Sequence, residues 1–381
     1  MKNETQIKLL FTAFIIGMLT FVIVAALSLS AKADDWSYLD STFRAMEQRT
    51  SGGMFDGKCR TFVITKDLQL PKIGKDNKTK TFVIENLTVK GGGLIASATD
   101  WNDLHNYQTN RTFILRNINI YSADVGMWIQ GSHRSTFATV SFWSCRVGGK
   151  FELCLEGYAE QLQEHQCRDT GVYVGISRLA GSTESNSQSN NFRINGFRSY
   201  GAGNSIALIY HGVSGGLVTN LTNEGGGCRI FLLVNSNGGR FMKDFRASQF
   251  HIECANKESV IKIIGGGYAN YYFSDIFPQV GNYLIDAEGS GFTVNVSNLF
   301  YQPYNTGWSV PYIKFAHKSA PNGDIWWNIV DCVTLDNIRT YYDPAYWKTG
   351  NGYNMPNPFS SGQQTNNRGS NRLCEIPYIL K

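Results

Sequence analysis

A short phrase recurs along this chain about every two dozen residues, and this period limits the folds that the chain can adopt. Each copy has a turn rich in glycine or asparagine, a few β-forming residues, and then a small polar residue before an apolar one. The polar–apolar steps are Asn86-Leu87, Asn117-Ile118, Ser141-Phe142, Asn195-Gly196-Phe197, Asn220-Leu221, Asp244-Phe245, Asp275-Ile276, Asn298-Leu299 and Asn337-Ile338. Apolar segments lie between them at Leu94-Ile95, Met127-Trp128, Val172–Val174, Ile206–Leu208, Phe231–Leu233, Val260–Ile263, Tyr283–Ile285 and Tyr312-Ile313. The period predicts stacked repeats.

Stacked units of this length predict an all-β fold, a right-handed, single-stranded parallel β-helix. Each unit has room for two or three short strands and none for a helix. Stacking would bury a continuous apolar core and pair the backbone of every strand with the units on either side. Asparagine and aspartate suit the corners because they tolerate the left-handed conformation. An antiparallel β-sandwich also has many short strands, but it gives no reason for an in-phase Asn or Asp.

The first 33 residues have the features of an export segment. Lys2 and Lys8 precede an uncharged, apolar stretch at Leu9–Leu27, and Ala31-Lys32-Ala33 has the small-x-small pattern of a cleavage site. The pattern predicts either a cleaved signal peptide or an anchor through residues 9–29, since roughly 20 apolar residues span a bilayer. In both cases we expect the β-helix outside the cytoplasm: secreted, held at a cell surface, or on a virion.

The remaining chain divides where the period begins and ends. We expect an N-terminal cap and first strands at 34–80, a β-helix at 81–340 with a rim insertion at 150–170, and a C-terminal cap or tail at 341–381. In the cap, Phe43–Gln48 has the pattern of a short helix with Ser41 as its N-cap. In the insertion, Leu155–Gln166 predicts a second short helix.

The cysteines permit disulfides but predict no metal site. There are eight: Cys59, Cys145, Cys154, Cys167, Cys228, Cys254, Cys332 and Cys374. An even number in an exported chain agrees with disulfides, and buried free thiols are the alternative. The pairs we expect are Cys154 with Cys167 and Cys332 with Cys374. No Cys-x-x-Cys spacing is present, and we expect neither a metal nor a cofactor.

Composition indicates a turn-rich protein that does not bind nucleic acid. The chain contains 39 glycines, and 17% of its residues are charged. Its formal charge is +5, of which Lys2, Glu4, Lys8 and Lys32 give a net +2, so +3 remains after the export segment. That charge is too small for binding to a phosphate backbone, and no cluster of lysine and arginine compensates for it.

The start of the predicted β-helix resembles a known superfamily. A capping helix is followed by Ser51-Gly52-Gly53, a strand at Thr61–Ile64, and the step Leu68-Gln69-Leu70-Pro71. This order resembles the beginning of the pectate-lyase-like superfamily, in the branch of tailspikes and polysaccharide depolymerases. The resemblance implies a polysaccharide or glycan as the partner, and a homotrimer like that of the tailspikes.

The catalytic motifs of the superfamily are mostly missing. The paired aspartates of polygalacturonase-type enzymes have no counterpart except Asp34-Asp35, which lies at the expected cleavage site. Their Gly-His-Gly motif is half present at His211-Gly212, and nothing matches Arg-Ile-Lys. A set of acidic calcium ligands with a basic residue, as in the pectate lyases, is also not recognisable. The resemblance therefore implies the architecture more strongly than the chemistry.

Several acidic residues are nevertheless candidates for catalysis. His251 and Glu253 are two residues apart and share one side of a strand. We expect Asp244 one strand earlier, Glu224 about one coil before them, and Asp275 about one coil after them. Stacked strands are about 4.8 Å apart. Carboxylates one or two coils apart could therefore reach the roughly 5–5.5 Å or 6.5–9.5 Å separations of retaining and inverting glycosidases.

Exposed aromatic residues offer a non-catalytic function, because sugars stack on aromatic rings. Tyr268, Tyr271 and Tyr272 follow a glycine-rich turn and are the best exposed candidates, with Arg246 as a further carbohydrate-binding residue. Two hypotheses follow. The chain either binds and cleaves an extracellular polysaccharide, or is a non-catalytic glycan-binding adhesin or the receptor-binding spike of a membrane-containing virus.

Overall fold

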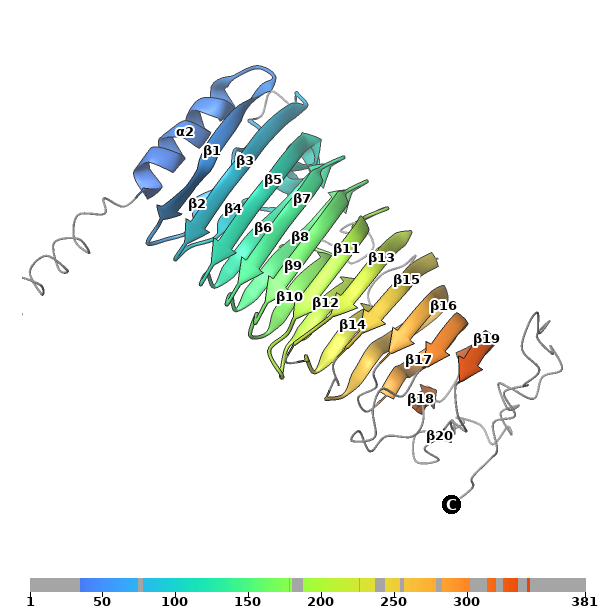
Figure 1. The fold of residues 1–381 in the computed structure, drawn as a ribbon. Helices are drawn as coiled ribbons and strands as arrows, with labels where there is room; N and C mark the ends of the chain where they lie inside the picture. Colours follow the sequence, from blue (N-terminus) through green and yellow to red (C-terminus); the bar gives the residue numbers. More distant parts are fainter. Residues whose placement is uncertain are drawn as a thin grey trace, which may run out of the picture.

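The predicted parallel β-helix is confirmed. The computed structural model describes residues 35–74, 78–177, 179, 188–225, 227–236, 244–253, 257–278, 283–301, 314–319, 325–334 and 341–342. These residues form an elongated stack of parallel strands with one helix across the N-terminal end (Figure 1). The prediction of a short N-terminal helix is therefore confirmed as well.

Two series of strands alternate along the chain and build the coils. The first series is β1 (Gly52–Val63), β3 (Lys80–Lys90), β5 (Arg111–Tyr121), β7 (Thr136–Trp143), β9 (Tyr158–His165), β11 (Arg193–Tyr200), β13 (Gly216–Asn223) and β15 (Asp244–Ile252). The second series is β2 (Leu68–Gln69), β4 (Leu94–Ala96), β6 (Val125–His133), β8 (Val147–Leu155), β10 (Thr170–Gly175), β12 (Ile206–His211) and β14 (Ile230–Asn235). Then β16 (Ser259–Pro278) and β17 (Tyr283–Tyr301) each contribute to both series, and β18 (Lys314–Ser319), β19 (Ile325–Thr334) and β20 (Tyr341–Tyr342) follow.

The solenoid has three faces. Each strand of the first series from β3 to β15 bends at one left-handed residue, so it contributes to two of them. We call the part before the bend the first face, the part after it the second face, and the second series the third face. Residues in register on successive coils, such as Tyr121, Trp143 and His165 at intervals of 22 residues, form rows along each face.

A row of left-handed residues marks the bend between the first and second faces. It contains Asn86, Asn117, Thr139, Gln161, Gly196, Asn220, Gln249, Asp275 and Asn298, all with positive φ. Side chains bond along the row where the residues allow it, as when Asn117 donates to Asn86 at 2.9 Å. The predicted corner position is therefore confirmed for Asn86, Asn117, Asn220, Asp275 and Asn298, because their short amide or carboxylate side chains lower the cost of this conformation. It is wrong for Ser141 and Asp244: Thr139 and Gln249 occupy the bend instead.

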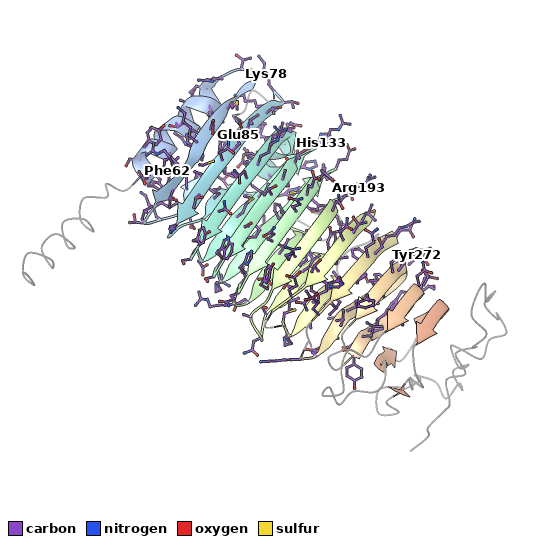
Figure 2. All side chains as sticks on the ribbon, in the orientation of Figure 1. Phe62, Lys78, Glu85, His133, Arg193 and Tyr272 are labelled. Atoms are coloured by element: carbon purple, nitrogen blue, oxygen red, sulfur yellow. The ribbon has the colours of Figure 1, made fainter. Side chains whose placement is uncertain are left out.

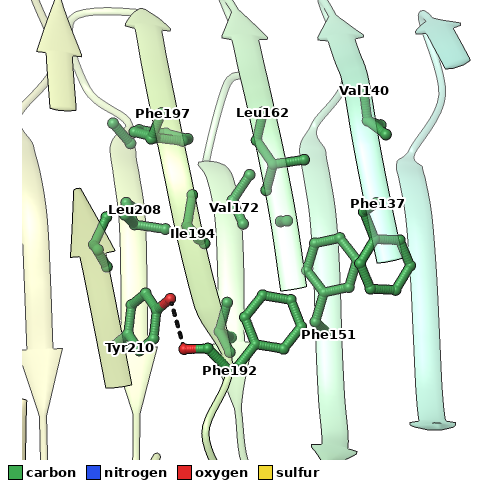
Figure 3. Close-up of a cluster of buried hydrophobic side chains, with 14 of the residues drawn as sticks. Phe137, Val140, Phe151, Leu162, Val172, Phe192, Ile194, Phe197, Leu208 and Tyr210 are labelled. Atoms are coloured by element: carbon green, nitrogen blue, oxygen red, sulfur yellow. Dashed lines mark hydrogen bonds between the residues drawn. The ribbon is translucent and has the colours of Figure 1, made fainter. Parts of the chain in front are cut away.

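The core is a column of apolar side chains contributed by all three faces. Phe137, Phe151 and Phe192 are fully buried, and their rings contact one another, with centroids 4.7 Å apart for Phe137 and Phe151 and 5.3 Å apart for Phe151 and Phe192 (Figure 3). The apolar segments of the sequence supply the third side of this column, where Met127, Val172 and similar residues face inward. The continuous core explains why single coils need neighbours on both sides.

The predicted rim insertion at 150–170 is wrong. β8 and β9 occupy this region and pair in register with the coils on either side. The expected helix Leu155–Gln166 is replaced by β9, in which Ala159, Leu162 and Glu164 face inward. The expected disulfide between Cys154 and Cys167 is wrong too, because both thiols are free. The pair Cys332 and Cys374 lies outside the described residues.

The N-terminal helix covers the open end of the core. α2 (Trp36–Gln48) buries Leu39, Phe43 and Met46 against the first coil. It begins before the residues assigned to it from sequence, with Asp35 at the N-cap position, so the prediction of Ser41 as the N-cap is wrong. The Ser41 hydroxyl instead donates to the Tyr38 carbonyl within the helix. The helix supplies the cover that an exposed first coil requires.

A second helical segment lies beside the third face. Asp100 is the N-cap of α3 (Trp101–Asn106), and its side chain accepts a hydrogen bond from the Asp103 backbone N–H. The short 3₁₀ helix η1 (Gln108–Asn110) follows directly and leads into β5. Arg111, the first residue of β5, is fully buried beneath this segment.

Candidate functional site

The first face carries a row of tyrosine and arginine side chains on five consecutive coils. Register aligns Tyr158, Arg193, Leu217, Arg246 and Tyr272. We call this set the Tyr–Arg row. Both tyrosines are among the few large apolar side chains that are exposed within the described residues, at 37% and 36%. Figure 2 shows Arg193 and Tyr272 along the same edge of the solenoid.

The Tyr–Arg row offers groups that are suited to sugars. The Arg246 guanidinium carbon lies 5.1 Å from the centre of the Tyr272 ring, so the charge and the ring form one combined surface. A tyrosine ring presents an apolar surface with a polar hydroxyl at its tip. A guanidinium group donates several hydrogen bonds in a fixed plane, which matches hydroxyl and carboxylate oxygens. Register places one such group on four of the five coils, and Leu217 occupies the coil between the two arginines.

The second face carries an aromatic stack. Tyr121, Trp143, His165 and Tyr200 follow one another on consecutive coils, with ring centroids separated by 5.5 Å, 3.5 Å and 4.5 Å and planes within 12° of parallel. The inner rings, Trp143 and His165, are therefore covered on both faces, and Lys90 Nζ lies 5.3 Å from the centre of the Tyr121 ring. We interpret the stack as structural, since sugar stacking needs a free ring face.

The stack changes the acid–base behaviour of its histidine. Burial between neighbouring rings, with a smaller contribution from the positive charge of Arg198, lowers the pKa of His165 to about 4. A lowered pKa means that the folded chain favours the neutral imidazole. The stabilisation this gives is present above the ordinary histidine pKa and is lost as pH falls towards 4.

Three of the predicted catalytic residues come together at the end of the second face. Glu224 and Glu253 follow the paired residues Asn223 and Ile252, so they occupy neighbouring positions on consecutive coils. His251 Nε2 lies 2.7 Å from Glu253 Oε1, and Arg198 lies 3.7 Å from Glu224. Neighbouring strands are about 4.8 Å apart, so the two glutamates start from backbone positions about one strand spacing apart.

The other two predicted acids lie elsewhere. Asp275 occupies the left-handed bend, where it accepts from the Asn298 amide at 3.0 Å. Asp244 begins β15 and interacts with Asn270 at 3.4 Å across the first face. Neither belongs to the pair formed by Glu224 and Glu253. The predicted set of five is therefore split by the bend into separate groups.

The predicted tyrosines also differ from one another. Tyr272 is exposed and belongs to the Tyr–Arg row, as does the predicted Arg246. Tyr271 is fully buried in the core, and burial raises the pKa of its hydroxyl to about 12, so the expectation of an exposed Tyr271 is wrong. The side chain of Tyr268 lies outside the described residues. Alternation along β16 separates Tyr271 from Tyr272, because adjacent residues of a strand face opposite sides.

Sequence reasoning missed a polar network on the third face. The buried carboxylate of Glu152 accepts from Trp128 Nε1 at 3.0 Å and from Gln130 Nε2 at 3.1 Å, and it pairs with Lys150 at 2.7 Å. All these contacts join β6 to β8 or stay within β8. Three donors compensate the buried charge, which fits a structural role.

The next two coils of the third face carry a polar pair, a tyrosine and a histidine. Tyr173 Oη lies 3.2 Å from His211 Nδ1, across the position of Gly175. A Cβ atom at Gly175 would lie 2.6 Å from the Tyr173 hydroxyl, so this arrangement requires glycine there. On β6 and β8, the spacing of two between Trp128 and Gln130 and between Lys150 and Glu152 is the sequence signal that could have identified the Glu152 network.

Comparisons with known proteins assign no family. No protein-family model matches the chain, and no curated protein matches it. Within the described ranges, no three His, Cys, Asp or Glu residues are grouped to hold a metal ion. Among the helices of these residues, none is long and apolar enough to cross a membrane, and the predicted anchor at 9–29 lies outside them.

Proposed function

We propose that this protein binds an extracellular polysaccharide lengthwise along the Tyr–Arg row. The observation that carries the proposal is the alignment of two exposed tyrosines and two arginines on four of five consecutive coils of one face. A linear chain of sugars can contact each coil in turn, with rings on Tyr158 and Tyr272 and oxygens on Arg193 and Arg246. The parallel β-helix is compatible with this role, because its long, rigid faces hold the contact residues in fixed positions.

Replacement of either exposed tyrosine tests the proposal. Tyr158→Ala and Tyr272→Ala are each expected to weaken binding to the recognised polysaccharide about tenfold, because each removes an aromatic contact surface at one end of the row. Isothermal titration calorimetry against a panel of neutral and uronic-acid polysaccharides measures the change. Tyr38→Ala, at an exposed tyrosine on α2, is the matched control and should bind like the parent chain.

Substitutions of the two arginines test whether the polysaccharide carries carboxylate groups. If the polysaccharide carries carboxylates, Arg193→Lys and Arg246→Lys should weaken binding, because lysine keeps the charge but loses the two-pronged geometry. Equal binding of all four row variants and the parent chain would refute the row as the binding site.

Cleavage by Glu224 and Glu253 is the second candidate, supported by their neighbouring positions at the end of the second face. One carboxyl group would protonate the leaving oxygen while the other attacks the sugar or activates water. The same panel, assayed for new reducing ends, should show products that disappear in Glu224→Gln and Glu253→Gln but persist in Asp275→Asn. No product from any substrate, with binding retained, leaves the non-catalytic adhesin or spike as the function.

We also propose a location for the protein. The apolar stretch at 9–29 supports export, and a glycan-binding protein is useful where surface polysaccharides are. We propose that the solenoid lies outside the cytoplasm, secreted or held at a cell or virion surface. A homotrimer, as implied by the resemblance to tailspikes, would align three Tyr–Arg rows for one polysaccharide surface.

A further inference from the structure

Two buried cysteines lie side by side on consecutive coils. Cys145 and Cys167 each come two residues after the paired residues Trp143 and His165. The Arg168 backbone N–H donates to the Cys145 carbonyl at 2.9 Å, so the coils stay in register beyond the ends of β7 and β9. Both side chains are fully buried, and the Cys167 thiol donates to the carbonyl of Phe142, on the coil that carries Cys145. Their sulfur atoms are therefore neighbours inside the solenoid.

The spacing of the coils suits a disulfide. Neighbouring parallel strands are about 4.8 Å apart, and the Cα atoms of disulfide-bonded cysteines are usually about 4.4–6.8 Å apart. Cys145 and Cys167 both lie in the corner after a strand rather than within it. Backbone hydrogen bonds still join the two coils there, from Ser144 N–H to the His165 carbonyl at 2.8 Å and from Arg168 N–H to the Cys145 carbonyl at 2.9 Å, so the two cysteines are held on adjacent coils.

Lack of space gives a simpler explanation for small residues at this corner. Ala123 precedes the cysteines in the same row, as the hydrogen bond from the Arg146 N–H to its carbonyl indicates. On the later coils, a Cβ atom at Gly201 would lie 2.8 Å from the Cβ of Cys228. Limited space therefore restricts the row to small side chains. It does not explain why two adjacent positions both carry sulfur.

We propose that Cys145 and Cys167 form a disulfide that ties two consecutive coils together when the chain folds under oxidising conditions. Each thiol gives up its proton, one sulfur–sulfur bond forms, and two electrons pass to a disulfide oxidant such as glutathione disulfide, which is released as two thiols. The proposal agrees with export but does not depend on it, because the oxidant can be supplied to the purified chain.

Peptide mapping tests the bond directly. The full-length chain is refolded with a glutathione redox buffer, alkylated without reductant and digested with trypsin. The expected product joins peptide 135–146 to peptide 151–168 and separates on reduction. The second peptide also contains Cys154, so Cys154→Ser is digested in parallel and should keep the cross-link, whereas Cys167→Ser should lose it. Alkylation of both Cys145 and Cys167 in the folded, oxidised chain would overturn the proposal.

A double-mutant cycle distinguishes the stabilisation by the disulfide from a requirement for small side chains at this corner. Cys145→Ser and Cys167→Ser should each lower the midpoint of thermal unfolding by about 5–10 °C, and the double variant should be no less stable than either. Reductant should lower the midpoint of the parent chain to that of the variants and leave the variants unchanged. Additive losses, with a parent midpoint that does not respond to reductant, would show that the corner needs only small side chains.

Discussion

Replacing Arg111 with alanine is expected to lower the free energy of unfolding by about 3–5 kcal/mol, as measured by urea denaturation. The fully buried guanidinium donates to the carbonyls of Gly131, Ala96 and Gln130 and to the side-chain oxygen of Gln108. Burial lowers its pKa to about 10, so it remains charged at neutral pH. Alanine would leave these buried oxygens without donors and leave a cavity under η1.

Two further substitutions define the cause of that loss. Arg116→Ala, at an exposed arginine of the same strand, should change stability by less than about 0.5 kcal/mol. Arg111→Lys keeps a charge but cannot reach four acceptors, so it should fall between the parent chain and Arg111→Ala. If Arg111→Ala costs no more than Arg116→Ala, the guanidinium does not hold η1 to the third face.

Replacing Phe192 with alanine is the second substitution with a large expected effect, a loss of about 3–5 kcal/mol in unfolding free energy. Its ring packs against Phe137 and Phe151 at the centre of the solenoid (Figure 3). Its carbonyl accepts from the Tyr210 hydroxyl at 3.4 Å, so the cavity would open beside a fixed backbone. The surrounding coils are paired on both sides and cannot collapse to fill it. Urea denaturation again measures the loss, with Phe192→Leu as a milder comparison.

Gly157 provides a coupled test of the same packing. A Cβ atom at this position would lie 2.5 Å from the ring of Phe192. Gly157→Ala should therefore destabilise the parent chain, but cost much less in the Phe192→Ala background, where the ring is absent. Equal costs in both backgrounds would mean that the cost of Gly157→Ala does not arise from contact with the Phe192 ring.

The fold could be predicted from sequence because two independent residue patterns repeat with the period of one coil. The left-handed bend selects small polar residues such as Asn86 and Asn117, and the core selects apolar segments such as Met127-Trp128. The bend was misplaced at Ser141 and Asp244 because Thr139 and Gln249 adopt the same conformation without the usual preference. On those coils the packed neighbours on both sides fix the backbone, and they override the weaker local tendency.

The helix predicted for Leu155–Gln166 shows that one sequence pattern can agree with both the helical repeat and the strand repeat. Glu156, Glu160 and Glu164 are four residues apart, which suits one side of a helix. In β9 a left-handed residue at Gln161 shifts the alternation, so Glu160 faces outward and Glu164 inward, where it accepts from Ser199. Pairing with β7 and β11 decides the outcome, and this pairing is not visible within the segment itself.

The candidate site could be predicted only in part. Glu224, His251 and Glu253 could be grouped from sequence because Glu224 and Glu253 lie one coil apart. Tyr158 was missed because it lay in the segment assigned to the rim insertion, and Arg193 because the residues before it interrupt the period. Which side chains become neighbours across coils depends on the number of residues in every intervening loop. A row is therefore recognisable only after the register is known.

The regular register has an evolutionary consequence. Because Tyr121, Trp143 and His165 recur at intervals of 22 residues, tandem duplication of one such interval inserts a complete coil without changing which side chains point outward. Each duplication lengthens the outer surface by about 4.8 Å. A lineage built on this scaffold can thus match longer or shorter target chains by gaining or losing whole coils, and can then diversify the new outward positions one at a time.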